Sequence, residues 1–201
     1  MRVLVACEYS GIVRDAFIRR GHDAWSCDIL DSDSKGPHIK GDVLNVLGDG
    51  WELMIAHPPC TYLCNSGVRW LERGNNKKRW KLMEEGADFF KKIIDAPVPK
   101  IAVENPVVHG YALKLIGRDF DQSIQPWEFG HGETKRTCLW LKNLPHLMPT
   151  RYVEGREHRI HRLSPGPMRG HERARTLVGI AEAMADQWGS YIHYFQKSIF
   201  D

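Results

Sequence analysis

The sequence predicts an α/β fold in which a mostly parallel sheet carries helices on both faces. Short apolar runs rich in β-branched residues alternate with amphipathic stretches along the 201 residues. This alternation is typical of βαβ units, whose strands lie parallel. Polar loops follow several of the apolar runs, at the strand ends where such sheets bind ligands. With 42% hydrophobic residues the chain can build a core, and we expect a single domain over 1–201.

The elements of the N-terminal half follow from apolar periodicity and from the residues that end each run. Arg2–Ala6 is a compact apolar run, and an amphipathic stretch begins after Gly11. Gly21 ends that helix, and Pro97 stops a longer one whose apolar residues recur at helical spacing. The prediction is strand 2–6, helix 12–20, strand 23–27, strand 51–56 and helix 80–94.

The C-terminal half predicts a strand, a hairpin and a last helix. The strand ends at Glu104, and the last helix has an Ala-rich packing face. A boundary, if the chain has one, falls at 145–149, and 146–175 is expected to be an Arg-rich loop segment. The predicted elements are strand 100–103, hairpin strands 123–126 and 137–141, and helix 179–188.

Cysteine usage and hydropathy indicate a cytoplasmic setting. No apolar run approaches the ~18 residues of a membrane span, and Met1 leads straight into an apolar run rather than a cleavable leader. The five cysteines are scattered, so we expect reduced thiols and no disulfide framework. We expect no membrane association.

The basic charge is concentrated in one segment. Seven Arg and three Glu lie in 151–175, a balance of +4 against +3 for the whole chain. An Arg-dense segment rich in Gly, Pro and His indicates phosphate contacts, and a solvated loop is the alternative.

Cys60 is the candidate nucleophile. It stands directly after two prolines at the end of a predicted buried strand, so the thiol is held on a rigid loop at the mouth of the sheet. Cys7, Cys27 and Cys138 lie in strand-like runs and are interpreted as small buried hydrophobic residues.

Glu104 is the candidate acid. It also ends a predicted strand, where a carboxylate is costly unless it has a partner or a chemical role. A structural ion pair is the alternative. A thiol and a carboxyl at one sheet edge indicate nucleophilic attack assisted by a proton donor or a hydrogen-bonding carboxyl.

The first turn is a candidate nucleotide-type pocket. The turn before 12–20 offers backbone donors at a helix start, although it contains one Gly and matches the pyrophosphate fingerprint poorly. Asp28, about 20 residues further on, stands where such folds place an acid for ribose hydroxyls.

Four segments in order carry a family resemblance. They are HPPCTYLCNSG at 57–67, AVENPVVHG at 102–110, KRTCLWLKNLP at 135–145 and GIAEAMADQWG at 179–189. Together they resemble the cytosine-carbon-5 DNA methyltransferases, in particular the short forms of bacteriophages and prophages. The resemblance implies a Rossmann-like, S-adenosylmethionine-dependent methyltransferase fold.

The resemblance also implies roles for particular residues. Cys60 matches the nucleophile that adds to carbon 6 of cytosine, so that carbon 5 takes the methyl group of S-adenosylmethionine. Glu104 matches the carboxyl that contacts the ring nitrogen, and Arg136 resembles the arginine that supports base and thiol. The base must be flipped out of the duplex to be reached. The implied cofactor residues are Glu8, Tyr9, Ser10, Gly11, Asp28, Ile29, Asp42, Val43, Pro58 and Ile180.

The partner implied by the resemblance is DNA. Large members insert a target-recognition domain before the last helix, where this chain has only its Arg-rich segment. Specificity is therefore expected to be short, weak or supplied by a partner. The second basic group flanks Trp70 and Trp80, and the polar face of a helix is its alternative. The candidate phosphate contacts are Arg69, Arg73, Lys77, Lys78, Arg79, Arg151, Arg156, Arg159 and Arg162.

The sequence also departs from the family and leaves other functions open. Where the family usually has a Phe-x-Gly-x-Gly type loop, this chain has Cys7–Gly11. Where the family has a Gln after the nucleophile and a Val after Glu-Asn, this chain has Thr61 and Pro106. One alternative function is a non-catalytic nucleic-acid-binding module. Another is a pyrimidine modification on a free nucleotide or with a modified donor. A zinc deaminase is a further one because His131-Gly-Glu133 has the His-x-Glu shape, but no Pro-Cys-x-x-Cys follows. His158 and His161 stand at helical spacing without further ligands, and no metal is expected.

Overall fold

The computed structural model describes residues 1–72, 76–166 and 169–197 and contains a seven-stranded sheet. The strand order is β3-β2-β1-β4-β5-β7-β6, and every neighbouring pair from β3 to β5 is parallel. β7 pairs antiparallel with both β5 and β6, which confirms the predicted hairpin. The strands are β1 Arg2–Ala6, β2 Asp23–Asp28, β3 His38–Lys40, β4 Leu53–Ala56, β5 Lys100–Asn105, β6 Gln122–Ile124 and β7 Thr137–Lys142.

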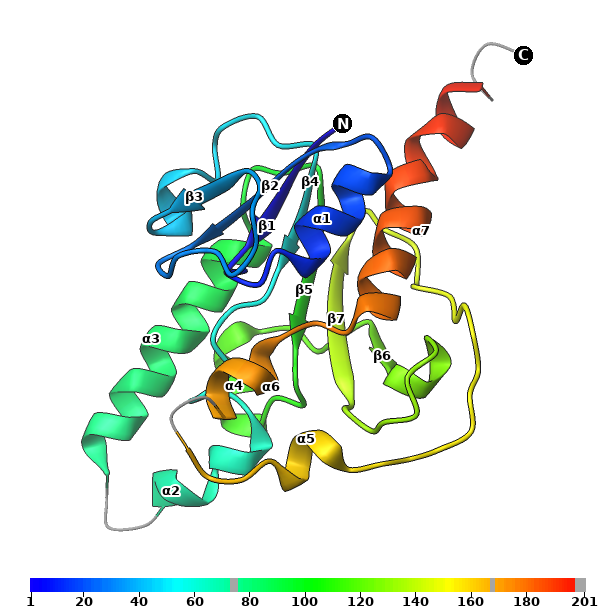
Figure 1. Cartoon of the computed structure of the whole chain (residues 1–201). Coiled ribbons are helices and arrows are strands. Elements are labelled where there is room, and N and C mark those ends of the chain that lie inside the picture. Colours follow the sequence, from blue (N-terminus) through cyan, green and yellow to red (C-terminus); the bar gives the residue numbers. More distant parts are fainter. Residues whose placement is uncertain (73–75, 167–168, 198–201) are drawn as a thin grey trace.

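Helices cover both faces of the sheet, as predicted (Figure 1). α3 and α4 pack on one face, and α1 and α7 pack on the other. The α-helices are α1 Ile12–Arg19, α2 Arg69–Glu72, α3 Lys77–Ile94, α4 Gly110–Ile116, α5 Arg159–Arg162, α6 Arg169–Ala174 and α7 Val178–Lys197. Short 3₁₀ helices are η1 Val43–Asn45, η2 Asn65–Gly67 and η3 Pro126–Glu128.

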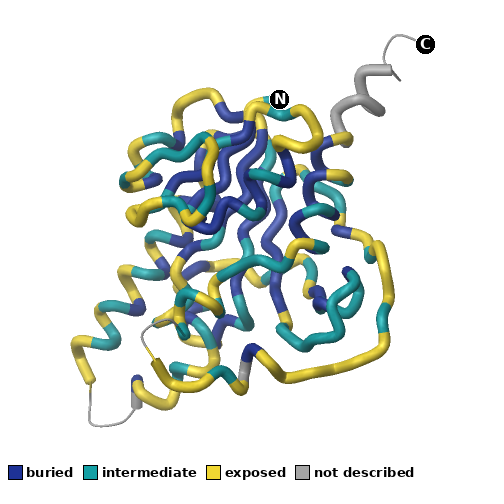
Figure 2. The backbone as a smooth tube through the Cα atoms, viewed as in Figure 1, coloured by how far each residue is buried: buried dark blue, intermediate teal, exposed yellow. Residues whose placement is uncertain are grey.

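The alternation of side chains along β1 explains why this strand is apolar throughout. Leu4 and Ala6 belong to the cluster under α3 and α4, and Val3 and Val5 belong to the cluster under α1 and α7. A strand covered on both faces needs apolar residues at every position. Figure 2 shows the result as a buried centre of strands with exposed segments around it. Among the described residues, no helix is both long and apolar enough to cross a membrane.

The short elements β3, α2, α4, α5 and α6 were not predicted. β3 has three residues and lies at the sheet edge, so it lacks the apolar pattern of a central strand. The first turn also differs from the prediction at Cys7, which lies beyond β1 and has a positive φ of 57°. Cys7 is partly exposed, whereas Cys27 and Cys138 are buried as expected.

The parallel order brings three strand-end loops together. β1, β4 and β5 are adjacent strands running in the same direction. Their carboxyl ends lead into Cys7–Gly11, into His57–Cys60 and into Pro106, respectively. The fold therefore gathers segments about 50 residues apart in sequence at a single edge of the sheet.

Candidate active site

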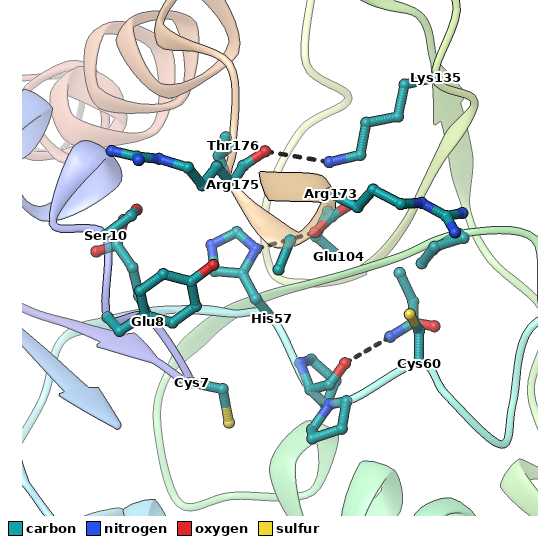
Figure 3. Close-up of a pocket in the computed structure, with 16 residues that line it drawn as sticks. Cys7, Glu8, Ser10, His57, Cys60, Glu104, Lys135, Arg173, Arg175 and Thr176 are labelled. Atoms are coloured by element: carbon teal, nitrogen blue, oxygen red, sulfur yellow. Dashed lines mark hydrogen bonds and ion pairs between the residues drawn. The ribbon is translucent and has the colours of Figure 1, made fainter. Parts of the chain in front are cut away.

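A cavity lies at the carboxyl ends of β1, β4 and β5 (Figure 3). The three strand-end loops form one part of its wall. A further part comes from residues 173–176, which directly precede α7. The lining residues are Cys7, Glu8, Tyr9, Ser10, His57, Pro58, Pro59, Cys60, Glu104, Asn105, Pro106, Lys135, Arg173, Ala174, Arg175 and Thr176.

The loop that carries Cys60 is held by backbone groups. Asn105 Nδ2 donates to the carbonyl of buried Pro58 at 2.8 Å, which ties the loop after β4 to the end of β5. The amides of Leu63 and Cys64 both donate to the Cys60 carbonyl at 3.0 Å. The thiol of Cys60 therefore projects from a tight turn whose position is set by the sheet.

The Cys60 thiol is hydrogen-bonded to the Cys64 thiol, and this contact separates their acidities. The hydrogen bond to Cys64 and burial raise the pKa of Cys60, and the negative charges of Cys64 and Glu104 raise it further. The same hydrogen bond lowers the pKa of Cys64 to about 5, against burial and with help from Ser66 and Arg173. The contact therefore favours a thiolate on Cys64 over a thiolate on Cys60.

Cys64 is expected to alkylate at a rate that does not change with pH between about 6 and 8. An ordinary thiol, with a pKa near ~8.5, speeds up about tenfold per pH unit in this range because its thiolate is still forming. Iodoacetamide labelling followed by peptide mass spectrometry measures the rate at each cysteine. Cys60→Ala should raise the pKa of Cys64 and make its alkylation rate more dependent on pH, because the hydrogen bond that lowers this pKa most is gone while those from Ser66 remain. A Cys64 rate that rises tenfold per pH unit in the wild type would contradict the assignment.

Glu104 is paired, and its partner is a histidine. His57 Nδ1 lies 3.0 Å from Glu104 Oε2, and the two side chains are 8% and 11% exposed. Burial alone would raise the pKa of Glu104. Hydrogen bonds from His57 and Thr137 and the charge of Lys135 outweigh burial and hold that pKa below its usual range. Glu104 is therefore ionised at neutral pH.

The cations at the cavity differ from the one predicted. Lys135 lines the cavity and donates from Nζ to the Arg175 carbonyl at 3.2 Å. Arg136 is exposed, lies 5.8 Å over the Phe120 ring and does not line the cavity. Neighbouring residues in an extended segment point to opposite sides, so only one of the two can face the site. Of these two neighbouring cations, Lys135 lines the cavity and Arg136 does not, and Arg173 is a second cation at the wall.

Glu8 occupies the helix start at which the sequence predicts a nucleotide-type pocket. Its carboxylate accepts from the amides of Val13 at 2.7 Å and Arg14 at 3.2 Å, and from Ser10 Oγ at 3.1 Å. These donors therefore bind a residue of the chain itself. Gly11 precedes α1 with a φ of 71°, a conformation that suits glycine.

The remaining cofactor candidates divide between the cavity and other places. Pro58 and Tyr9 line it, and Ile180 is 4% exposed in the core under α1 and α7. Asp28 Oδ1 accepts from Leu30 N at 2.9 Å at the end of β2. The other positions, outside the cavity lining, are Ile29, which is 73% exposed, Asp42, which caps η1 through Leu44 N, and buried Val43.

The candidate phosphate contacts are mostly exposed, with one exception. Arg79 folds back instead, with Nη2 3.4 Å from the Thr61 carbonyl and its guanidinium 5.1 Å from the Tyr62 ring centre. Arg73 lies outside the described residues. The exposed candidates are Arg69, Lys77, Lys78, Arg151, Arg156, Arg159 and Arg162.

Three of these exposed arginines already have partners. Arg69 lies 4.9 Å over the Trp70 ring. Arg156 lies 4.1 Å over the Trp127 ring, and Arg159 pairs with Glu133 at 2.9 Å. α2, the start of α3 and α5 lie on the side of the sheet where β1, β4 and β5 end (Figure 1). Their basic residues therefore share a side of the molecule with the cavity.

The residues considered for a zinc deaminase have structural contacts. His131 Nε2 accepts from Gly179 N at 2.9 Å, which ties a loop to the start of α7, and Glu133 is the partner of Arg159. Among the described residues, no three His, Cys, Asp or Glu side chains gather as a metal site requires.

Sequence reasoning missed His57, Lys135 and the wall residues 173–176. His57 stands three residues before Cys60, and its place in the same strand-end loop was the available signal. Lys135 was visible as the neighbour of Arg136. Nothing in the local pattern of 173–176 links this segment to β4 and β5, because its approach depends on tertiary packing.

The sequence matches no protein-family model and no curated protein. Among solved structures, the chain is similar to a protein described as a DNA modification methyltransferase encoded within an E. coli prophage, at 14% identity over 77% of this chain and 52% of that one, with a TM-score of 0.47. It is similar to Entamoeba histolytica methyltransferase EhMeth at 14% identity, 76% and 57% coverage and a TM-score of 0.48. An Escherichia coli rRNA methylase matches at 19% identity, 70% and 56% coverage and a TM-score of 0.35.

The chain spans about half the length of these proteins. The fold assignment rests on the sheet itself. Its order is the dinucleotide-binding order 3-2-1-4-5-6 with one antiparallel strand, β7, inserted between β5 and β6. The fold is thus Rossmann-like, with a mostly parallel sheet and helices on both faces, as the sequence predicts.

Proposed function

We propose that this protein transfers a methyl group from S-adenosylmethionine to carbon 5 of cytosine in DNA. The observation that supports this most is the convergence of Cys60 and Glu104, from the ends of β4 and β5, on one cavity. A nucleophilic thiol and a carboxyl are the two groups that addition to a pyrimidine ring requires. The ordered segments around Cys60 and Glu104, which resemble those of cytosine-carbon-5 methyltransferases, point the same way.

The residues at the ends of β2 and β3 suit S-adenosylmethionine in part. Exposed Ile29 offers apolar surface for an adenine ring, and Asp28 offers a carboxylate for ribose hydroxyls. Asp28 and Asp42 both act electrostatically on Cys7 at the cavity wall, so the two carboxylates lie close to the cavity. Glu8 excludes an anionic group from the start of α1. When bound, the donor supplies an electrophilic methyl group.

The protein residues divide the work of the addition. Cys60 passes its proton to Cys64 and attacks carbon 6 of the ring as the thiolate. Glu104, oriented by His57, takes up a proton from water when the base binds and passes it to the ring nitrogen, which neutralises the charge that the addition pushes into the ring. The elimination that regenerates the aromatic ring returns this proton. Lys135 adds a positive field at the carboxylate.

DNA is the proposed acceptor. We expect this single domain to hold DNA mainly through contacts with the DNA phosphates. Carbon 6 of a paired base is shielded within the stack, so the cytosine has to leave the duplex to reach Cys60. The exposed basic residues of α2, α3 and α5 on the cavity side supply phosphate contacts without reading sequence. A partner that supplies specificity remains part of the proposal.

Label transfer tests the proposal directly. Methyl-labelled S-adenosylmethionine is incubated with cytosine-containing duplex and single-stranded DNA, and with free deoxycytidine monophosphate. Cys60→Ala should abolish transfer, whereas Cys138→Ala, the same change at a buried thiol of β7, should retain it. Mass spectrometry of the digested DNA should identify 5-methylcytosine.

The test also distinguishes the alternatives. The occupied helix start at Glu8 keeps a non-catalytic nucleic-acid-binding module as the second candidate. Calorimetric binding of S-adenosylmethionine with no transfer to any acceptor would favour it. Transfer to the monophosphate alone would replace DNA by a nucleotide as the acceptor.

A further inference from the structure

His57 has an unused nitrogen at the cavity. Its side chain is 8% exposed, and among the described residues its Nε2 is a buried atom with no hydrogen-bond partner. An unpaired buried nitrogen is destabilising, so a group at this position is expected to have a ligand or a role. Figure 3 shows the ring at the cavity wall, beside Glu104.

The contact at the other nitrogen determines what Nε2 can do. Glu104 Oε2 lies 3.0 Å from Nδ1, and Glu104 is ionised. A carboxylate accepts hydrogen bonds only, so Nδ1 carries the proton. The Nε2 of the neutral ring is then an acceptor, and a proton that arrives there forms an imidazolium that Glu104 stabilises. A carboxylate that orients a histidine base in this way is a recurring catalytic arrangement.

The proposed reaction releases a proton for which none of the groups assigned so far provides an acceptor. Once carbon 5 carries the methyl group it still holds its hydrogen, and sulfur is still bonded to carbon 6. Cys64 already holds the proton of Cys60, and Glu104 is engaged with the ring nitrogen. Lys135 and Arg173 are cations at neutral pH and accept no proton.

We propose that His57 Nε2 is the base that removes the hydrogen from carbon 5. The C5–H bond breaks and its proton goes to Nε2. Its electron pair re-forms the C5–C6 double bond, and the C6–S bond breaks with its pair left on Cys60 as thiolate. The imidazolium then loses the proton to water. This step deepens the proposed cytosine methylation and rests on it.

His57→Asn is the sharpest variant. The Asn amide nitrogen stands close to the position of Nδ1 and can still donate to Glu104, but nothing replaces Nε2. His57→Gln is the second variant, and His146→Asn, the same change at an exposed histidine, is the matched control. Thermal unfolding of each variant shows whether its fold is retained.

Two DNA substrates separate the steps. With ordinary cytosine, His57→Asn should lower methyl turnover by at least about 10²-fold, which is the lower range for a general base. With 5-fluorocytosine, removal at carbon 5 is blocked in every protein, so the variant should form the covalent adduct as the wild type does. Deuterium at carbon 5 should slow the variant more than the wild type, because C5–H cleavage becomes rate-limiting.

Each other result overturns the inference. Equal loss of adduct and turnover in His57→Asn and His57→Gln would show that His57 acts before the addition or only positions Glu104. Wild-type turnover in both variants would show that His57 has no part in the reaction. Absence of transfer and of adduct in the wild type would instead overturn the proposed function itself.

Discussion

Glu104→Gln is expected to reduce methyl transfer to cytosine by about 10²- to 10⁴-fold. The glutamine amide has nearly the same shape as the carboxyl group, and its oxygen can still accept a hydrogen bond from His57 Nδ1. It cannot pass a proton to the ring nitrogen. Charge pushed into the ring by Cys60 then has no neutralising partner. Adduct formation with 5-fluorocytosine DNA should fall with turnover, because Glu104 acts on the addition. Single-turnover transfer and gel-resolved adduct yield measure the two effects.

The comparison with His57 makes this prediction specific. Glu104→Gln should lower both adduct and turnover, whereas His57→Asn should lower turnover alone. Glu128→Gln changes a glutamate outside the cavity, in the cap of η3, and should leave transfer at the wild-type level. Glu104→Gln turnover within a factor of about three of the wild type would remove Glu104 from the mechanism.

Arg14→Met is expected to lower the free energy of unfolding by about 3–5 kcal/mol, since it removes one side of a buried charged network. The Arg14 side chain is 0% exposed and lies 2.8 Å from Asp15. Its guanidinium donates to the hydroxyls of Ser26 and Ser34 and to the Pro37 carbonyl, at 3.0, 2.5 and 3.4 Å. Met fills the space but removes these donated hydrogen bonds, and the Pro37 carbonyl keeps its contacts with Ser26.

Arg19→Met is the control, on the same helix. Arg19 is 51% exposed and pairs with Glu182 at 3.7 Å, a surface contact that contributes about 0–1 kcal/mol. Urea unfolding of both variants gives the comparison. Arg14 holds the loop after β2 through Ser34 and Pro37, and this loop begins next to the proposed cofactor residues Asp28 and Ile29. Arg14→Met should therefore also weaken S-adenosylmethionine binding, which calorimetry measures. A loss below about 1 kcal/mol for Arg14→Met would contradict the stabilising role of the network.

The central strands could be predicted from the sequence because each of them is a continuous apolar run. β1, β4 and β5 are covered on both faces, so their apolar residues run without interruption in the sequence. The edge strand β3 and the short helices α5 and α6 carry no such run, and their position comes from tertiary contacts. The burial of Arg14 was also not predicted, because a charged residue in an amphipathic helix is normally expected to face solvent.

The site was predictable where a residue ends a strand. Cys60 and Glu104 were found this way, because parallel strands place their carboxyl ends together. Arg136 was assigned from its motif, but the choice between it and Lys135 depends on which side of an extended segment faces the cavity. The role of Glu8 as a cap for α1 depends on the turn geometry at Cys7 and Gly11, both of positive φ.

Covalent trapping tests the central claim most directly. DNA with 5-fluorocytosine at its cytosine positions is incubated with the protein and S-adenosylmethionine, and the adducted peptide is located by mass spectrometry. The proposed mechanism predicts an adduct that requires S-adenosylmethionine, carries one added methyl group and is attached at Cys60. An adduct that survives Cys60→Ala, or methyl transfer to cytosine with no adduct at Cys60, would contradict it.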